Sequence, residues 1–168
     1  MTTKKEAING RRDISLHHPS PAAAIQTGNS QEPVFGAAVY YRQDSANYSG
    51  IYIGRDHIIQ LSGTGRIEKV YLQDLTTEVW FPCIKESGQA AGLCTTGYIA
   101  LEMLDNGSSD QPIIGNCHQF TSGCITSNFE NGDHTLEMVK HTFAGSLDFP
   151  ILWKKWELQS SPQAGIHP

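Results

Sequence analysis

Hydrophobic and polar positions alternate with a two-residue period through much of the first half of the chain. The run VFGAAVYY, residues 34–41, follows a proline and precedes the polar turn RQDSAN, which is typical of a strand. The segments YSGIYIG and HIIQL flank the short turn RD and predict a hairpin. RIEKVYL alternates in the same way after a glycine-containing turn. EVWFPCI is either one more strand or an extended connection, because Pro82 cannot donate to a ladder. Together these patterns predict a meander of about four antiparallel strands.

The hydrophobic period becomes helical in the second half. GQAAGLCTTGYIALEMLDNG predicts a helix whose buried face carries Ala90, Leu93, Cys94, Gly97, Tyr98, Leu101 and Leu104. CHQFTSGCI and DHTLEMVKHTF show the same spacing, with Asp133 as the expected N-cap of the second and Glu137 in its first turns. ILWKKWEL alternates again and predicts a closing strand. Strands followed by helices predict an α+β domain, with a small antiparallel sheet of about four to six strands and helices packed on one face.

The composition fits one folded domain with polar ends. The chain has 168 residues, of which 39% are hydrophobic and 17% are charged, enough for one core and too few for two comfortable domains. Residues 1–33 are polar and broken by Pro, Gly and Ser, so we expect a disordered or flexible leader. We expect residues 34–158 to form the domain and residues 159–168 to form a flexible tail.

The charge and the hydropathy pattern exclude some classes of partner. The formal net charge of -5 disfavours nucleic acid, because phosphate binding depends on clustered Lys and Arg. No run reaches the roughly 20 apolar residues of a transmembrane segment, and no secretory signal is visible at the N-terminus. We therefore expect a cytoplasmic protein. Export as an effector, with the polar leader as its targeting tail, remains the alternative.

The four cysteines are expected to be free thiols, because a reducing cytosol does not keep disulfides. They are Cys83, Cys94, Cys117 and Cys124. In the stretch GNCHQFTSGC, Asn116 is a good N-cap, which would place Cys117 in the first turn of a helix. The free N–H groups there favour a thiolate, so Cys117 is a candidate nucleophile. Burial as a small apolar side chain is the alternative interpretation.

A metal site at Cys117 is disfavoured by the spacing of its neighbours. The chain has no C-x-x-C or H-E-x-x-H pattern, and the remaining histidines are scattered. His118 follows Cys117 directly and would point about 100 degrees away from it on a helix. We therefore predict no metal and no organic cofactor.

Several of these short blocks occur in an order that resembles a known family. GIYIG, a turn, IIQL, a glycine-containing loop, IEKV, and later NC with a Phe at a helix start are similar to the lecithin:retinol acyltransferase-like family. That family belongs to the circularly permuted branch of NlpC-type papain-like folds, and picornaviral H-box/NC proteins share its pattern. The resemblance covers about Val34 to Phe129.

The resemblance implies a cysteine nucleophile that forms an acyl thioester. In the family, the helix-start cysteine attacks an ester or amide carbonyl, a strand histidine acts as the base, and a second histidine orients the first. The nucleophile position matches Cys117. The position of the base is occupied by Tyr48, and the position of the second histidine by Gln60.

The loss of both histidines predicts weak chemistry. A tyrosine hydroxyl keeps its proton at pH 7, and a glutamine amide cannot usefully accept one. His57 would point to the face opposite Gln60, because the side-chain period of a strand is two. Gln60 and Tyr48 would instead form a hydrogen-bonded pair.

Two functions remain open after this comparison. The first is a catalytically impaired domain whose cleft binds an acyl group, a peptide or a protein partner. The second is an active thiol acyltransferase or hydrolase that acts on a lipid ester or an amide through a Cys117 thioester.

Overall fold

The structure is a computed structural model that describes residues 25–106 and 113–158. Most of the predicted leader and the whole predicted tail lie outside the described residues. The strands are β1 (Ile25–Gly28), β2 (Ala38–Gln43), β3 (Ala46–Gly54), β4 (His57–Leu61), β5 (Ile67–Tyr71), β6 (Glu78–Ile84), β7 (Ala90–Leu93) and β8 (Ile151–Glu157). The helices are the short 3-10 helix η1 (Leu72–Asp74) and the α-helices α3 (Cys94–Asp105), α4 (Cys117–Thr126) and α5 (Leu136–Leu147).

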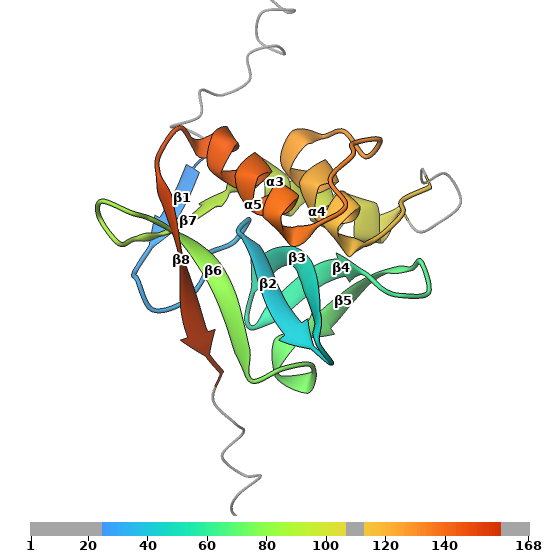
Figure 1. The fold of residues 1–168 in the computed structure, drawn as a ribbon, viewed down its shortest axis with the longest axis horizontal. Helices are drawn as coiled ribbons and strands as arrows, with labels where there is room; N and C mark the ends of the chain where they lie inside the picture. The colour runs from blue at the N-terminus through green and yellow to red at the C-terminus, as the bar shows by residue number, and fades with distance from the viewer. Residues whose placement is uncertain (1–24, 107–112, 159–168) are drawn as a thin grey trace, which may run out of the picture.

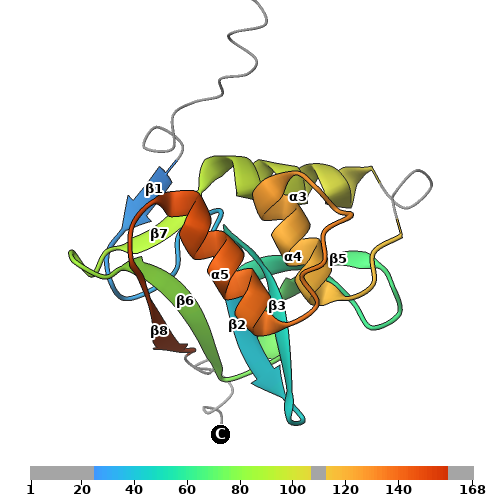
Figure 2. The same cartoon turned by 45° about the horizontal axis from the view of Figure 1, so that its top comes forward.

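The described strands form one antiparallel sheet of eight strands. Its order is β1-β7-β6-β2-β3-β4-β5, and β8 pairs with β6 beside this path. The three α-helices lie together on one side of the sheet (Figures 1 and 2). The α+β class with helices on one face is therefore confirmed, and the sheet is larger than the four to six strands predicted.

Two of the additional strands lie where the sequence pattern indicated something else. β1 falls inside the predicted leader and pairs with β7, so the ordered chain begins at least nine residues before residue 34. β7 occupies the start of the predicted helix, which begins only at Cys94. Both strands have four residues. Segments this short show no clear period, and their pairing depends on backbone hydrogen bonds across the sequence.

Two further predictions were wrong in detail. On the predicted buried face of α3, Tyr98 is 64% exposed, while the fully buried Ala100 lies outside that face, because the buried stripe of the helix is centred on Thr96, Gly97 and Ala100. The N-cap of α5 is Thr135 rather than Asp133. The Asp133 carboxylate instead accepts hydrogen bonds from the hydroxyls of Ser122 (2.7 Å) and Thr142 (2.6 Å), and so ties α4 to α5.

The core has two parts, one on each face of β2, β3 and β4. Ile51 and Ile59 are paired across β3 and β4 and contact the helices, with Phe120 and Phe143 in the same cluster. Tyr52 and Ile58 form the next pair and belong to the second cluster, away from the helices. Successive residues of β3 and β4 thus point to opposite faces of the sheet, as the two-residue period of the sequence predicted.

The hairpin formed by β3 and β4 positions the candidate site. Its turn, Arg55-Asp56, has positive φ at both residues (54° and 62°), as a tight two-residue hairpin turn requires. The predicted turn is therefore confirmed. α4 packs on this hairpin with almost every residue buried, and Cys117, Phe120 and Cys124 lie in the core as their spacing predicted.

A matched pair of helix glycines tests the packing around α4. In α4, a Cβ at Gly123 would lie 2.8 Å from Cγ of Phe129, whereas in α5 a Cβ at Gly145 would meet nothing within 4 Å. We expect Gly145→Ala to raise the free energy of unfolding by about 0.5–1 kcal/mol through lower backbone entropy. We expect Gly123→Ala to lower it by about 1–3 kcal/mol through overpacking. Urea denaturation of both variants measures the difference, and equal effects would contradict the close packing at Gly123.

Candidate functional site

Cys117 is the first residue of α4, as predicted. The Asn116 side chain caps the helix, because its Oδ1 accepts a hydrogen bond from the Gln119 N–H at 2.9 Å. Asn116 Nδ2 also donates to the main-chain oxygen of His134 at 3.1 Å. These bonds hold the cap in place, so the start of α4 is a well-defined position for the thiol.

A cavity of about 300 Å³ lies beside the Cys117 side chain, which is 9% exposed. Its walls come from β3, from the end of β4 and the following turn, and from the segment that leads into α4. The lining residues are Tyr48, Leu61, Ser62, Gly63, Gly65, Ile114, Gly115, Asn116 and Cys117. Two of the three residues that the resemblance selected, Cys117 and Tyr48, therefore line one cavity.

The entry segment of this cavity is held by Gln119. Its Oε1 accepts from the Gly115 N–H at 2.6 Å, and its Nε2 donates to the main-chain oxygen of Phe129 at 2.8 Å. One amide thereby joins the segment before α4 to the segment after it. The wall of the cavity next to Cys117 is rigidly supported as a result.

Opposing effects act on the Cys117 thiol. Burial raises its pKa above the ordinary value, because a thiolate loses its hydration there. Hydrogen bonds from the main chain and hydroxyl of Ser49 act in the opposite direction, as do those from the N–H groups of Cys117 and His118. Burial is the larger effect, so the thiol stays protonated at neutral pH although donors for a thiolate surround it.

Gln60 has a different partner from the one predicted. It is buried in β4, and its Oε1 accepts the Tyr41 hydroxyl at 2.8 Å. The Tyr41 ring stacks on Tyr48, with centroids 5.5 Å apart. The predicted Gln60–Tyr48 pair is therefore replaced by Gln60–Tyr41. Tyr41 and Tyr48 are directly paired across β2 and β3, and this register brings Tyr41 to the same face.

Tyr41 cannot supply the missing base. Burial is the largest cause that raises its pKa, which reaches about 12, and its single proton is donated to Gln60. Tyr41 thus links Gln60 to Tyr48, which lines the cavity beside Cys117. No sequence pattern pointed to Tyr41, because its hydrogen bond to Gln60 depends on the pairing of β2 with β3.

His118 packs against β3, a contact that the sequence did not predict. It is buried, and its Nδ1 lies 2.8 Å from the Ser49 hydroxyl oxygen. The same hydroxyl lies 2.9 Å from Thr121 Oγ1. Neighbouring residues at the start of α4 differ in direction, but β3 runs under both of them, so Cys117 and His118 both reach Ser49. Ser49 is a polar residue on the same face of the predicted strand as Ile51 and Ile53. This break in the apolar pattern is the sequence signal that could have indicated Ser49.

None of the other described histidines lines this cavity. His57 Nδ1 lies 2.7 Å from the main-chain oxygen of Arg55, and its ring packs against Tyr71. His134 precedes α5 rather than lying in it, and His141 is exposed. Within residues 25–106 and 113–158, no three His, Cys, Asp or Glu side chains are grouped to hold a metal ion.

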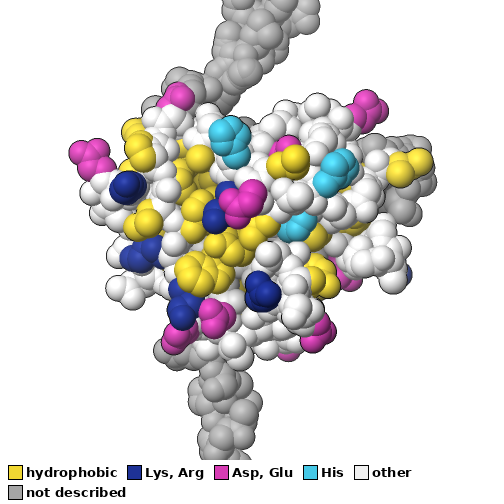
Figure 3. Space-filling view, viewed as in Figure 1, with side chains coloured by type: hydrophobic (Ala, Val, Ile, Leu, Met, Phe, Trp, Pro, Cys, Tyr) yellow, Lys and Arg dark blue, Asp and Glu magenta, His cyan; other side chains and the backbone are white. Residues whose placement is uncertain are grey.

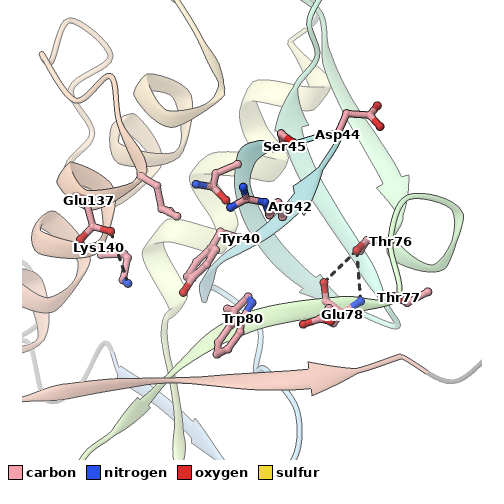
Figure 4. A pocket seen from close by; sticks show the side chains of 12 residues that line it. Tyr40, Arg42, Asp44, Ser45, Thr76, Thr77, Glu78, Trp80, Glu137 and Lys140 are labelled. Carbon is pink, nitrogen blue, oxygen red and sulfur yellow. Dashed lines mark hydrogen bonds and ion pairs between the residues drawn. The ribbon is translucent and has the colours of Figure 1, made fainter.

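A larger cavity of about 670 Å³ lies between the β2–β3 hairpin, β6 and α5 (Figure 4). The rings of Tyr40 and Trp80 are stacked there with an interplanar angle of 8°. Lys140 lies 5.2 Å from the Tyr40 ring centroid and 3.9 Å from Glu137. On the face drawn in Figure 3, hydrophobic side chains form a band bordered by charges of both signs. No cysteine or histidine lines this cavity, whereas the candidate nucleophile Cys117 lines the smaller one.

No family model matches the chain, and comparisons with curated proteins and with solved structures also found no match. None of the described helices is long and apolar enough to cross a membrane. The site is therefore interpreted from its own geometry.

A pair of tyrosine variants tests the hydrogen bond to Gln60. Tyr41→Phe leaves the buried Gln60 oxygen without its donor, so we expect the free energy of unfolding to fall by about 1–3 kcal/mol. Tyr48→Phe removes a hydroxyl that is not the partner of Gln60, so we expect a change within about 0.5 kcal/mol. Urea denaturation distinguishes the two, and a larger loss for Tyr48→Phe would restore the pairing predicted from the sequence.

Proposed function

We propose that this chain is a degenerate cysteine acyltransferase-like or hydrolase-like domain, related to the permuted papain-like fold, that binds a carbonyl-containing group beside Cys117. Its occupant is an acyl group, a peptide or a segment of a protein partner. The observation that carries the proposal is the cavity next to Cys117, which has Tyr48 in its wall and no histidine among its lining residues.

The start of α4 suits the carbonyl part of such a ligand. Helix N-termini present free N–H groups and favour negative charge, and α4 begins at the cavity. A carbonyl oxygen that enters the cavity would meet these donors close to the sulfur. This arrangement supports the binding of acyl and amide groups over the binding of cations.

The cavity also limits the size of the bound group. Its volume of about 300 Å³ lies at the lower end of the range for small-molecule sites. A short acyl chain or one peptide side chain fits this volume. A complete lipid would have to leave most of its length outside.

Impaired catalysis follows from the missing base. Tyr48 occupies the position at which the resembling family has its histidine, and a phenol keeps its proton at neutral pH. Gln60 is committed to Tyr41, and burial keeps the thiol protonated. A positioned base contributes about 10²–10⁴-fold to such reactions, so a large part of the rate would be lost.

An active thiol acyltransferase or hydrolase is the second candidate. The observation that favours it is the contact between His118 Nδ1 and the Ser49 hydroxyl, which itself hydrogen-bonds Cys117. An imidazole is thus one hydroxyl away from the sulfur.

Acylation by p-nitrophenyl acetate tests the proposal. We expect intact-mass spectrometry and peptide mapping to find slow acetylation of Cys117 in the wild type and none at that position in Cys117→Ser. We expect the double variant Tyr48→His, Gln60→His to acetylate about 10²-fold faster, because it restores a base and its orienting partner. Tyr48→Phe is the size-matched control that adds no base, and it should stay at the wild-type rate.

Two results would overturn the proposal. A folded double variant with no gain in rate would show that Tyr48 and Gln60 do not lie in catalytic positions. Rapid turnover by the wild type, with no increase in the double variant, would establish the second candidate instead. Circular dichroism of each variant confirms that the fold is intact.

A further inference from the structure

A buried hydroxyl connects the candidate nucleophile to an imidazole. Ser49 lies on β3 with its side chain toward α4, and it is 0% exposed. Its hydroxyl hydrogen-bonds the Cys117 thiol and lies 2.8 Å from His118 Nδ1. Both residues come from the first turn of α4, so one strand residue joins two consecutive helix residues that do not contact each other through their side chains.

We propose that Ser49 relays the proton of Cys117 to Nδ1 of His118, which acts as the base in place of the two missing strand histidines. The inference rests on the proposed function, since it takes Cys117 as the nucleophile, and it names how the remaining reactivity arises. His118 acts through Ser49 and needs no contact with the sulfur.

The surroundings of His118 suit a neutral proton acceptor. Burial lowers the pKa of His118, and a hydrogen bond from the ring to the Asn47 main chain opposes this effect. Since Nδ1 faces Ser49, this bond to Asn47 falls to the other ring nitrogen, Nε2. A proton held on Nε2 leaves the lone pair of Nδ1 directed at the Ser49 hydroxyl.

The relay moves two protons and neither adds one to nor removes one from the group of three side chains. The Cys117 S–H bond breaks as its proton passes to Ser49 Oγ, while the Ser49 O–H proton passes to His118 Nδ1. The result is a Cys117 thiolate, an unchanged Ser49 hydroxyl and an imidazolium with a proton on both nitrogens. After the thiolate attacks a carbonyl, the Ser49 O–H proton passes to the leaving group, and the proton on His118 Nδ1 passes to Ser49 Oγ.

Thr121 contacts Ser49 but lies outside this path. Ser49 Oγ donates to Thr121 Oγ1 at 2.9 Å, and Thr121 Oγ1 donates to the main-chain oxygen of Cys117 at 2.9 Å. The relay therefore requires the Ser49 hydroxyl to turn from Thr121 to Nδ1 of His118. Thr121 competes with His118 for the Ser49 proton and is not needed to carry it. Thr121 is as buried as Ser49, which makes it a matched control for the loss of one buried hydroxyl.

Few ionisable groups surround the relay. The titratable side chains around it are Cys117 and His118 of α4, Tyr48 of β3 and Tyr41 of β2. The causes resolved for the shifts of Cys117 and His118 include no Asp, Glu, Lys or Arg. The transfer therefore creates an ion pair in a buried site with no compensating charge, so only a small share of the protein carries the thiolate. We therefore expect Cys117 to react slowly even with the relay in place.

Alkylation of the full chain by iodoacetamide tests the relay. The rate at Cys117 is followed by peptide mass spectrometry from about pH 5.5 to pH 9.5, a range that spans ordinary imidazole and thiol titrations. For the wild type, we expect a plateau in the neutral range, where neutral His118 accepts the proton. We expect Ser49→Ala and His118→Asn to lose about tenfold or more at pH 7 and to show a rate that rises with pH throughout.

Two controls separate the relay from a structural role. Asn at position 118 keeps a polar atom near the place of Nδ1, so the hydrogen bond to Ser49 survives while the titration is lost. Thr121→Val removes the neighbouring hydroxyl, and we expect it to keep the wild-type rate within about twofold and the same pH profile. The free energy of unfolding of all three variants shows whether they are equally destabilised.

Three outcomes would overturn the relay. One is a Cys117 rate in Ser49→Ala and His118→Asn that equals or exceeds the wild-type rate, and another is an equal loss in Thr121→Val. The third is a wild-type Cys117 that is not alkylated at any pH although it reacts after denaturation. None of these outcomes removes the gain expected for Tyr48→His, Gln60→His, so failure of the relay is distinguishable from failure of the proposed function.

Discussion

The packing of α4 on β3 is the contact on which the candidate site depends. α4 is buried along nearly its whole length, and its first turn places Cys117 and His118 against Ser49. Polar groups in such a contact must find partners, because an unpaired buried polar atom is costly. Ser49, Thr121 and the ring of His118 satisfy one another, which makes the polar start of α4 compatible with a packed core. The same bonds determine where the thiol lies.

Burial has opposite consequences for structure and for chemistry at this contact. It fixes the position of Cys117 within a capped helix, and fixed geometry is what a nucleophile needs. It also removes water from the sulfur, which raises the pKa of the thiol and lowers that of His118. On the other side of the thiol, the Tyr41 ring stacks on Tyr48 and its hydroxyl donates to Gln60, so these side chains add packing there instead of charge.

The two cavities differ in how far their polar groups are already engaged. In the larger one, Lys140 lies against the Tyr40 ring and also meets Glu137, so the chain itself supplies partners for this charge. In the smaller one, Cys117 and Tyr48 border an open volume beside a helix N-terminus. A ligand therefore gains new contacts more readily at the smaller cavity. This difference, rather than size, marks the smaller cavity as the functional candidate.

The sequence alone determined the elements with a clear period and a clear boundary. The strands of the β3–β4 hairpin, β5, and the N-cap and core positions of α4 could be predicted, because period and turn chemistry act over a few neighbouring residues. The start of α4 at Cys117 followed from Asn116 in the same local way. Only the tertiary structure decided the rest. β1 and β7 exist through pairing with each other, Gln60 meets Tyr41 because of the β2–β3 register, and His118 reaches Ser49 because β3 runs beneath the first turn of α4. Each of these contacts joins residues distant in sequence, and no local pattern specifies which residue on another element will lie opposite.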